Sequence, residues 1–309
     1  MTMMRAIRIH EFGGPQVLRN EEIPLPQPKA GEILVRIAAA SVNPVDYKTR
    51  EGKFPAVGEK DLPLTLGRDL AGEVTSAGGE GPAKGAFVFA LLGHDRGAYA
   101  QYAIVKASEW APAPHNLSPV EAAAVPLAAL TAWQGLFDHG GLSAGQRVLI
   151  HGGAGGVGHM AIQMAKAKGA FVATTVAADD LDFVRGLGAD QAIDYKNQRF
   201  ENAVRDIDLV YDLIGGETQT RSFAVLKSGG AMVSTLQQPD EAKARENNIR
   251  GAHYMAEPNA GELKQIAELI QAGKVRPVIY QTFPLDDAAK AETVLAEGHV
   301  RGKIVLTMD

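Results

Sequence analysis

Hydrophobic positions along the chain follow two different patterns. In the first third, short strand-like runs at 32–38, 72–75 and 86–90 are separated by segments dense in glycine and proline. Such runs without a regular helix are typical of a compact, barrel-like β domain. Farther along, Ser118 and Glu121 predict a capped helix start, and strand-like and helical patterns then alternate. This alternation predicts an α/β fold with a doubly wound parallel sheet.

The C-terminal part returns to a strand-rich pattern. Strand character at 278–283 and 303–307 flanks a helical pattern at 286–296. We expect this tail to rejoin the β domain. The sequence therefore predicts one domain formed by 1–119 and 273–309, and a parallel-sheet domain formed by 120–272.

The clearest motif is a glycine-rich turn between two predicted strands. Gly153, Gly155 and Gly158 form a G-x-G-x-x-G motif, a helical pattern runs from there to Gly169, and 171–176 is the next strand. The glycines allow a tight turn, close backbone approach to a pyrophosphate and close packing of helix on strand. The helix N-terminus offers free N–H groups to the anion. The motif predicts a dinucleotide site.

Composition narrows the chemistry further. The net charge of −5 gives no general attraction to nucleic acid or to anionic membranes. We find no apolar run approaching the ~20 residues that span a bilayer and no signal-peptide pattern, so we expect a cytoplasmic protein. The absence of cysteine excludes thiolate catalysis and cysteine-bound metals. The chemistry therefore depends on a bound cofactor or on oxygen and nitrogen side chains.

Several further motifs occur in a fixed order along nearly the whole chain. They lie at 6–15, 39–48, 67–74, 97–102, 129–133, 187–190, 193–195 and 302–306, in addition to the glycine turn. In these segments the chain resembles the medium-chain dehydrogenase/reductase superfamily, and within it the zinc-free quinone oxidoreductases and the related enone reductases. The resemblance implies a GroES-like, partly open β-barrel catalytic domain joined to a Rossmann nucleotide-binding domain.

Two of these motifs differ from those of the zinc-dependent members. There a cysteine precedes an aspartate in one motif, and Gly-His-Glu forms another. Here the first reads Asn43-Pro-Val-Asp46 and the second Gly67-Arg68-Asp69. A catalytic zinc would lose its thiolate and its imidazole ligand. We therefore expect no metal.

The segment after the first strand-like run provides catalytic candidates. The resemblance places Asn43 beside the nicotinamide, although an Asn-Pro turn is an equally ordinary reason for this residue. We expect Asp46 to order the loop by accepting backbone N–H bonds. Lys48 is a candidate for stabilising a substrate oxyanion, with a surface lysine as the alternative. Tyr47 is a weaker candidate for that role or for proton donation.

Two other residues are candidates for the substrate pocket. Arg68 stands where the zinc enzymes keep histidine and could orient a substrate oxygen, but an ion pair with Asp69 explains it equally well. Tyr99 could line the pocket or simply pack on a strand.

The remaining candidates concern the cofactor. The glycine turn, the ends of the sheet strands and the resemblance together give Thr131, Gly153, Gly155, Gly156, Val157, Gly158, Thr174, Thr175, Tyr195, Ile214, Gly215, Thr235, Leu236 and Lys303.

Two features of the sequence bear on the form of the dinucleotide. If the second strand ends at Thr174 and Thr175, there is room for a 2′-phosphate, and the resemblance places Tyr195 beside it. Asp179, about twenty residues beyond Gly158, could instead hold the ribose hydroxyl of NADH, or favour a helix N-terminus together with Asp180. We favour NADPH over NADH.

The sequence thus predicts an NADPH-dependent, metal-free oxidoreductase that transfers hydride to a small quinone or α,β-unsaturated carbonyl. The alternative is a non-catalytic NADP-binding redox sensor or structural protein of the same fold. We also expect a homodimer formed through edge strands around Ile249–Met255.

Overall fold

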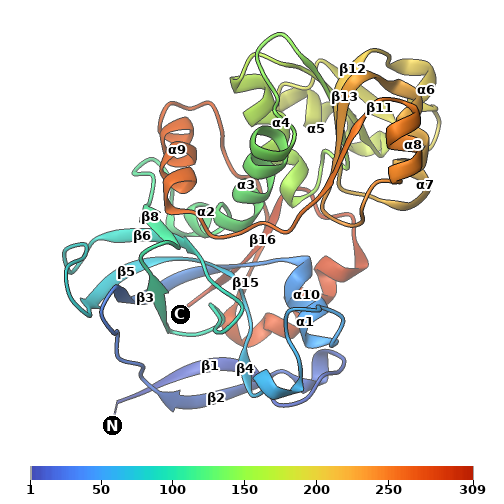
Figure 1. Cartoon of the computed structure of the whole chain (residues 1–309). Helices are drawn as coiled ribbons and strands as arrows, with labels where there is room; N and C mark the ends of the chain where they lie inside the picture. The colour runs from blue at the N-terminus through green and yellow to red at the C-terminus, as the bar shows by residue number, and fades with distance from the viewer. Residues whose placement is uncertain (1, 309) are drawn as a thin grey trace. The chain divides into compact units, whose positions relative to one another are not determined.

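The computed structural model describes residues 2–308, which form two compact units. Unit 1 comprises Met1–Leu127, Pro258–Gln271 and Pro277–Asp309, and unit 2 comprises Ala128–Glu257 and Ala272–Arg276. Figure 1 shows both units and labels many of their helices and strands.

Unit 1 is built mainly from β-strands. These are β1 (Met3–Ile9), β2 (Arg19–Pro24), β3 (Glu32–Val42), β4 (Leu64–Thr65), β5 (Asp69–Ala77), β6 (Phe87–Leu91), β7 (Tyr102–Lys106), β8 (Trp110–Pro112), β15 (Ile279–Pro284) and β16 (Lys303–Thr307). Its helices are α1 (Pro44–Arg50), α2 (Pro119–Ala123), α9 (Ala260–Gln271) and α10 (Ala288–Glu297), with short 3-10 turns η1 (Pro15–Val17), η2 (Glu59–Asp61) and η6 (Leu285–Asp287).

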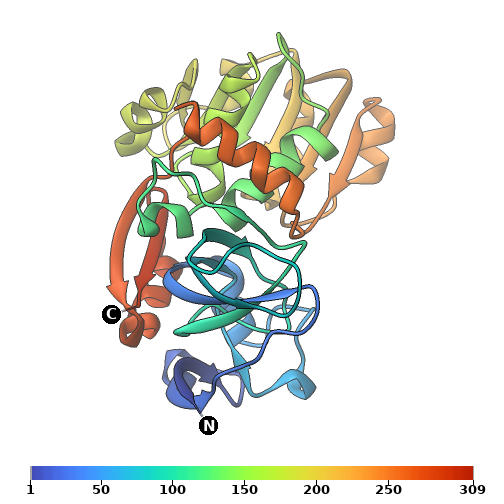
Figure 2. The same cartoon turned by 90° about the vertical axis from the view of Figure 1, so that its left-hand side faces the viewer.

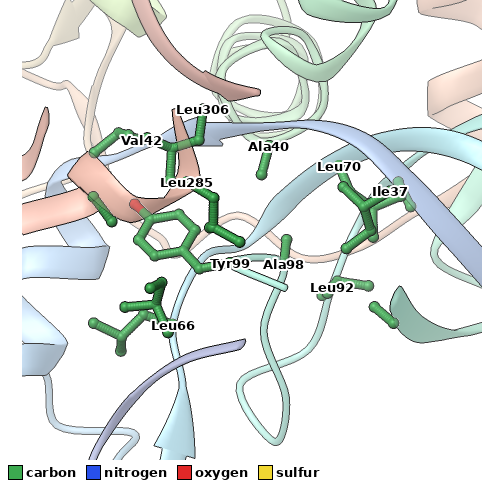
Figure 3. Close-up of a cluster of buried hydrophobic side chains, with 14 of the residues drawn as sticks. Ile37, Ala40, Val42, Leu66, Leu70, Leu92, Ala98, Tyr99, Leu285 and Leu306 are labelled. Carbon is green, nitrogen blue, oxygen red and sulfur yellow. The ribbon is translucent and has the colours of Figure 1, made fainter. Parts of the chain in front are cut away.

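The long strand β3 organises the main sheet of unit 1. The strand order is β15-β16-β3-β5-β6-β8, with β7 also paired to β3, and β2-β1-β4 form a separate three-stranded sheet. Strand β16 pairs antiparallel with β3, which confirms that the C-terminal tail returns to the β domain. Strands β15 and β16 run side by side in red at the left of Figure 2. An apolar core that includes Leu66, Leu70 and Leu306 lies against this sheet (Figure 3).

Helix α1 was not expected from the pattern of the first third of the chain. The Asn-Pro pair begins a helix rather than only a turn: Asn43 is its N-cap, and Pro44 occupies the first helical position, where a missing N–H is tolerated. The helix has only seven residues and buries Asp46, Thr49 and Arg50, which are all polar. It therefore lacks the apolar periodicity by which helices are usually found.

Unit 2 is the predicted doubly wound domain. Its strands β9 (Arg147–His151), β10 (Phe171–Val176), β11 (Gln191–Asp194), β12 (Ile207–Asp212), β13 (Leu226–Ser234) and β14 (Arg250–His253) are all parallel. Their order is β11-β10-β9-β12-β13-β14, so the direction of winding reverses between β9 and β12. In open α/β sheets, ligands bind at the carboxyl ends of the strands at such a switch point.

Helices cover both faces of this sheet. They are α4 (Gly156–Ala167), α5 (Leu181–Gly186), α6 (Phe200–Ala203), α7 (Gly216–Ser222) and α8 (Glu241–Glu246), with 3-10 turns η4 (Ala178–Asp180) and η5 (Phe223–Val225). Helices α4 and α8 lie on opposite faces in Figure 1. Helix α3 (Pro126–Trp133) leads into a π-helical segment, η3 (Gln134–His139).

The limits of unit 2 differ from the expected 120–272 at its start and at its end. Residues 120–127 and helix α9 belong to unit 1, because α2 packs on β3 and β5, and α9 packs on β8. Asn116 also donates a hydrogen bond to the Ile270 carbonyl (3.0 Å). Residues 272–276 belong to unit 2. An amphipathic pattern shows that a helix is half-buried, but it does not show which sheet the helix covers.

Within residues 2–308, none of the helices combines the length and the apolar character needed to cross a lipid bilayer.

Candidate functional site

A cluster of polar side chains is buried in unit 1 at the start of α1. Lys303 is fully enclosed at the first position of β16, and its Nζ donates to Asn43 Oδ1 and to the Val42 carbonyl (3.1 Å). Asn43 Nδ2 in turn donates to Asp69 Oδ2 (2.9 Å). The Asn43 amide is therefore held at both ends. A cofactor contact of Lys303 stays a prediction. In unit 1 its ammonium already donates hydrogen bonds to Asn43 and to the Val42 carbonyl.

Asp69 is the anionic centre of this cluster. Its carboxylate accepts hydrogen bonds from Ser41 Oγ (2.5 Å) and the Leu127 amide (2.6 Å), and it lies 3.8 Å from Lys303 Nζ. Burial lowers the pKa of Lys303, and the nearby carboxylates of Asp69 and Asp46 oppose that shift. The buried Lys303–Asp69 pair is thus joined by the side chain of Asn43.

Arg68 points away from Asp69, which corrects the ion pair considered as an alternative. Its Nε donates to the Leu92 carbonyl (2.6 Å), and its Nη1 lies 2.7 Å from His94 Nδ1. Successive side chains on extended backbone face opposite ways, so these neighbours have different partners. Burial and the Arg68 charge lower the pKa of His94 to about 4, which leaves the ring neutral at pH 7. Arg68 Nη2 is buried and lacks a hydrogen-bond partner within residues 2–308.

Asp46 orders the start of α1, as expected. Its Oδ2 accepts hydrogen bonds from the Asn43 amide (2.8 Å) and from the Tyr99 hydroxyl (3.0 Å). Burial raises the pKa of Asp46 to about 7, with Glu292 contributing repulsion. The ring of Tyr99 lies in the apolar core beside Leu66 (Figure 3), and the residue is fully buried. Tyr99 is therefore a core residue that supports Asp46 and does not line a pocket, because β-strand packing encloses it.

Tyr47 and Lys48 are the two α1 candidates that remain partly accessible. Both side chains are half-buried. Burial raises the pKa of Tyr47 above its ordinary value of 10.0, so its phenol stays protonated at neutral pH. The Lys48 ammonium has no hydrogen-bond or ion-pair partner in the part of the chain from 2 to 308. It is available to a ligand oxygen.

The residues at the positions where the resemblance would place zinc ligands do not suit a divalent cation. Arg68 replaces one ligand, and the Lys303 ammonium contacts Asn43, which replaces another. Two buried positive charges oppose a further cation. Residues 2–308 also contain no group of three or more His, Cys, Asp or Glu placed to hold a metal ion.

The glycine turn of unit 2 fits a pyrophosphate. Gly155 is the N-cap of α4, and Gly156, Val157 and Gly158 form its first turn, whose N–H groups have no intrahelical partner. A Cβ on Gly158 would overlap the Gly152 carbonyl oxygen, and one on Gly153 would overlap Thr174 Oγ1. Only glycine therefore allows the helix to begin this close to the turn.

Thr174 and Thr175 do not end their strand, which corrects the basis on which they were chosen. Strand β10 continues to Val176, and both side chains are buried. The Thr174 hydroxyl donates to the Ile150 carbonyl (2.7 Å), and the Thr175 hydroxyl bonds His151 Nδ1 (2.9 Å). Because helices cover both faces of a parallel sheet, hydroxyls in mid-strand find partners inside the fold rather than on a ligand.

The carboxyl edge of the sheet exposes apolar side chains. Tyr195, Ile214 and Leu236 follow β11, β12 and β13, and they are 55%, 54% and 44% exposed. Thr235, between β13 and Leu236, is half-buried. Ligands of open α/β sheets bind along this carboxyl edge, so the three exposed apolar side chains are candidates to contact one.

Two residues of this edge were missed by sequence reasoning. Asp212 is buried at the end of β12, and its Oδ1 accepts hydrogen bonds from the amides of Ile214 (3.0 Å) and Gly215 (2.9 Å). It thereby sets the loop that carries Ile214. Lys196 follows Tyr195, is exposed, and has no side-chain partner among the described residues. Its place directly after the 193–195 motif was the signal that could have identified it.

Comparison with known proteins agrees with this arrangement. Family models described as "Alcohol dehydrogenase GroES-like domain" and "Zinc-binding dehydrogenase" match residues 29–115 and 187–306. A 2-methylene-furan-3-one reductase from Solanum lycopersicum is 37% identical over 322 residues, covering 98% of this chain and 79% of that protein. The chain belongs to the medium-chain dehydrogenase/reductase superfamily.

Two other members of the superfamily narrow the branch. The chain is 36% identical over 317 residues to an NADPH-dependent alkenal/one oxidoreductase from Arabidopsis thaliana, covering 98% of this chain and 79% of the relative. It superposes on the structure of a quinone oxidoreductase from Coxiella burnetii with a TM-score of 0.92, at 35% identity and with all of both chains covered. The chain is therefore an oxidoreductase of the quinone oxidoreductase and enone reductase branch, and the GroES-like and Rossmann folds are confirmed.

Proposed function

We propose that the chain is an NADPH-dependent reductase that adds hydride to a quinone or an α,β-unsaturated carbonyl without a metal ion. One observation carries the proposal: Arg68 occupies a zinc-ligand position, is buried, and keeps one hydrogen-bond donor, Nη2, without a partner in residues 2–308. A buried, unpaired donor on a cation costs free energy unless an acceptor binds it. A carbonyl oxygen of the substrate is such an acceptor.

Unit 2 carries the residues that would hold the dinucleotide. The N–H groups of Gly156, Val157 and Gly158 would bind the pyrophosphate. The Tyr195 ring and the Lys196 ammonium would bind the adenosine with its 2′-phosphate, which favours NADPH over NADH. The Arabidopsis relative is named as NADPH-dependent, which supports the same choice. When bound, the nicotinamide supplies the hydride.

The cations of unit 1 support the proposal of a conjugated acceptor. Addition of hydride to carbon leaves negative charge on the acceptor oxygen, and Arg68 and Lys48 would stabilise this charge. Tyr47, Lys48 or water would then deliver the proton. A conjugated acceptor spreads the developing charge over its π-system, so these side chains suffice where a simple ketone would need a Lewis acid.

Steady-state kinetics test the proposal. Oxidation of NADPH and of NADH is followed at 340 nm with a panel of quinones, enones and simple ketones. We expect turnover with NADPH and a conjugated acceptor, and a loss of about 10²-fold in kcat/KM for Arg68→Met, by analogy with removal of one oxyanion donor. Arg36→Met is the matched control, because Arg36 is exposed and pairs with Glu73 on the surface. NADPH binding without oxidation by any acceptor would indicate the non-catalytic alternative.

We further propose a cytoplasmic homodimer joined through β14. This strand is at the edge of its sheet and pairs with β13 alone among the strands of unit 2. The other side of its backbone can therefore pair with a strand of a second chain. Light scattering at micromolar concentration should give twice the chain mass of 32.7 kDa. A mass of one chain would contradict the dimer and leave the proposed activity untouched.

A further inference from the structure

The helix that carries Thr131 changes its hydrogen-bond pattern just after that residue. Helix α3 ends at Trp133 and continues as the π-helical segment η3, Gln134–His139. Such segments are rare and frequently lie at functional sites. Gly135 lies within this segment although glycine disfavours helix interiors. The π-helical segment and the glycine at 135 are both explained by the side chain of Tyr254.

The hydroxyl of Tyr254 is inserted into the helix. It donates to the Thr131 carbonyl and accepts the Gly135 N–H. In an ordinary α-helix, the Gly135 N–H would bond the Thr131 carbonyl directly. Tyr211, from the central strand β12, donates to the same carbonyl (2.9 Å), and its oxygen lies 2.7 Å from that of Tyr254. The inserted phenol replaces the backbone hydrogen bond between Gly135 and Thr131.

Glycine at 135 and the residues around it hold this phenol in place. A Cβ on Gly135 would lie 2.5 Å from the Tyr254 hydroxyl oxygen, so only glycine leaves room for it. The Gln134 amide donates to the Glu257 carbonyl (2.9 Å) and accepts from the Glu257 N–H (3.0 Å). The His139 ring lies 4.5 Å from the Tyr254 ring. Tyr254, which directly follows β14, is thus fixed against the helix. It lies 123 residues from Thr131 in the sequence.

We propose that Tyr254 is a positioning residue for the nicotinamide end of the cofactor. Its hydroxyl holds the backbone at Thr131 in the widened form, and Thr131 then meets the carboxamide of the nicotinamide. The inference rests on the proposed function and on the cofactor contact that the resemblance implies for Thr131. Tyr254 itself touches neither cofactor nor substrate in this role.

Removal of the hydroxyl has a defined consequence. In Tyr254→Phe the ring still fills its space, but the Gly135 N–H and the Thr131 carbonyl lose their bridge. They can then bond each other, which draws the helix toward α geometry and shifts Thr131. The glycine turn and Tyr195 lie elsewhere on unit 2 and keep their own contacts. Only the nicotinamide end should therefore bind less well.

The test compares two ligands and two matched variants. Dissociation constants for NADPH and for 2′,5′-ADP, which lacks the nicotinamide, are measured for the wild type, Tyr254→Phe and Tyr211→Phe. We expect Tyr254→Phe to weaken NADPH about tenfold and to leave 2′,5′-ADP within about twofold. Tyr211→Phe removes a hydroxyl from the same carbonyl but leaves the bridge, so both ligands should stay within about twofold. Equal effects on both ligands, or no effect of Tyr254→Phe, would overturn the proposal.

A measurement on the wild type covers the case in which Tyr254→Phe does not fold. Amide hydrogen exchange in the segment 131–139 should be slowed more by saturating NADPH than by saturating 2′,5′-ADP. Equal protection by the two ligands would contradict the inference. The proposed function fails separately, if the wild type neither binds NADPH nor oxidises it with any acceptor.

Discussion

Replacement of Lys303 by methionine tests the polar cluster of unit 1 most directly. The side chain is 3% exposed and donates to Asn43 and to the Val42 carbonyl, and its Nζ lies 3.8 Å from Asp69. Methionine fills a similar volume but leaves the Asp69 charge without its cationic partner. Breaking a buried pair in this way typically costs about 3–5 kcal/mol. Asp69 keeps three hydrogen-bond donors, from Ser41, Asn43 and Leu127, so we expect the lower end, about 3 kcal/mol.

Tryptophan fluorescence can follow the unfolding of unit 1 alone. The chain has two tryptophans, and Trp110 packs against the core of unit 1. In a Trp133→Phe background, urea unfolding monitored by Trp110 therefore reports this unit. Lys264→Met serves as control, because Lys264 is exposed on α9, and surface changes usually stay within about 0.5 kcal/mol.

A second substitution separates charge from shape. Asp69→Asn in the Lys303→Met background removes the uncompensated charge, so the double variant should regain about 1–2 kcal/mol over Lys303→Met alone. A loss below about 1 kcal/mol for Lys303→Met, or a double variant less stable than Lys303→Met, would refute the reasoning. Either result would mean that the pair does not hold Asn43 in the way described.

Three further predictions concern other parts of the molecule. The folded state raises the pKa of Asp46 from 3.8 to about 7, so it binds a proton more tightly than the unfolded state. Stability of unit 1 should therefore fall as the pH rises from about 4 to about 7 in urea titrations monitored by Trp110, and less steeply in Asp46→Asn. Gly158→Ala should weaken NADPH binding more than tenfold by fluorescence titration, whereas Gly186→Ala, whose Cβ meets open space, should leave it unchanged. Lys196→Ala should raise the dissociation constant of NADPH about fivefold and leave that of NADH unchanged, and equal changes would remove Lys196 from the 2′-phosphate site.

Local patterns predicted much of the fold correctly. The strand expected at 171–176 is β10 with the same limits, and the helix start at Ser118 has the predicted capping box with Glu121. These features depend on alternation, glycine and capping within a few residues, which a sequence displays directly. Helix α1 was missed because its buried face is polar, and a polar face carries no periodic apolar signal.

The sequence by itself determined the two fold classes, the glycine turn at 153–158 and the ordering of the 43–46 backbone by Asp46. Tertiary structure alone decided which partner each polar side chain has. Lys303 meets Asn43 across 260 residues, and Tyr254 enters the helix at Thr131 across 123. The hydroxyls of Thr174 and Thr175 likewise bond partners on the neighbouring strand, Ile150 and His151. A local pattern records burial, but a buried polar group bonds whatever the packed chain brings to it, and that neighbour is set by the whole fold.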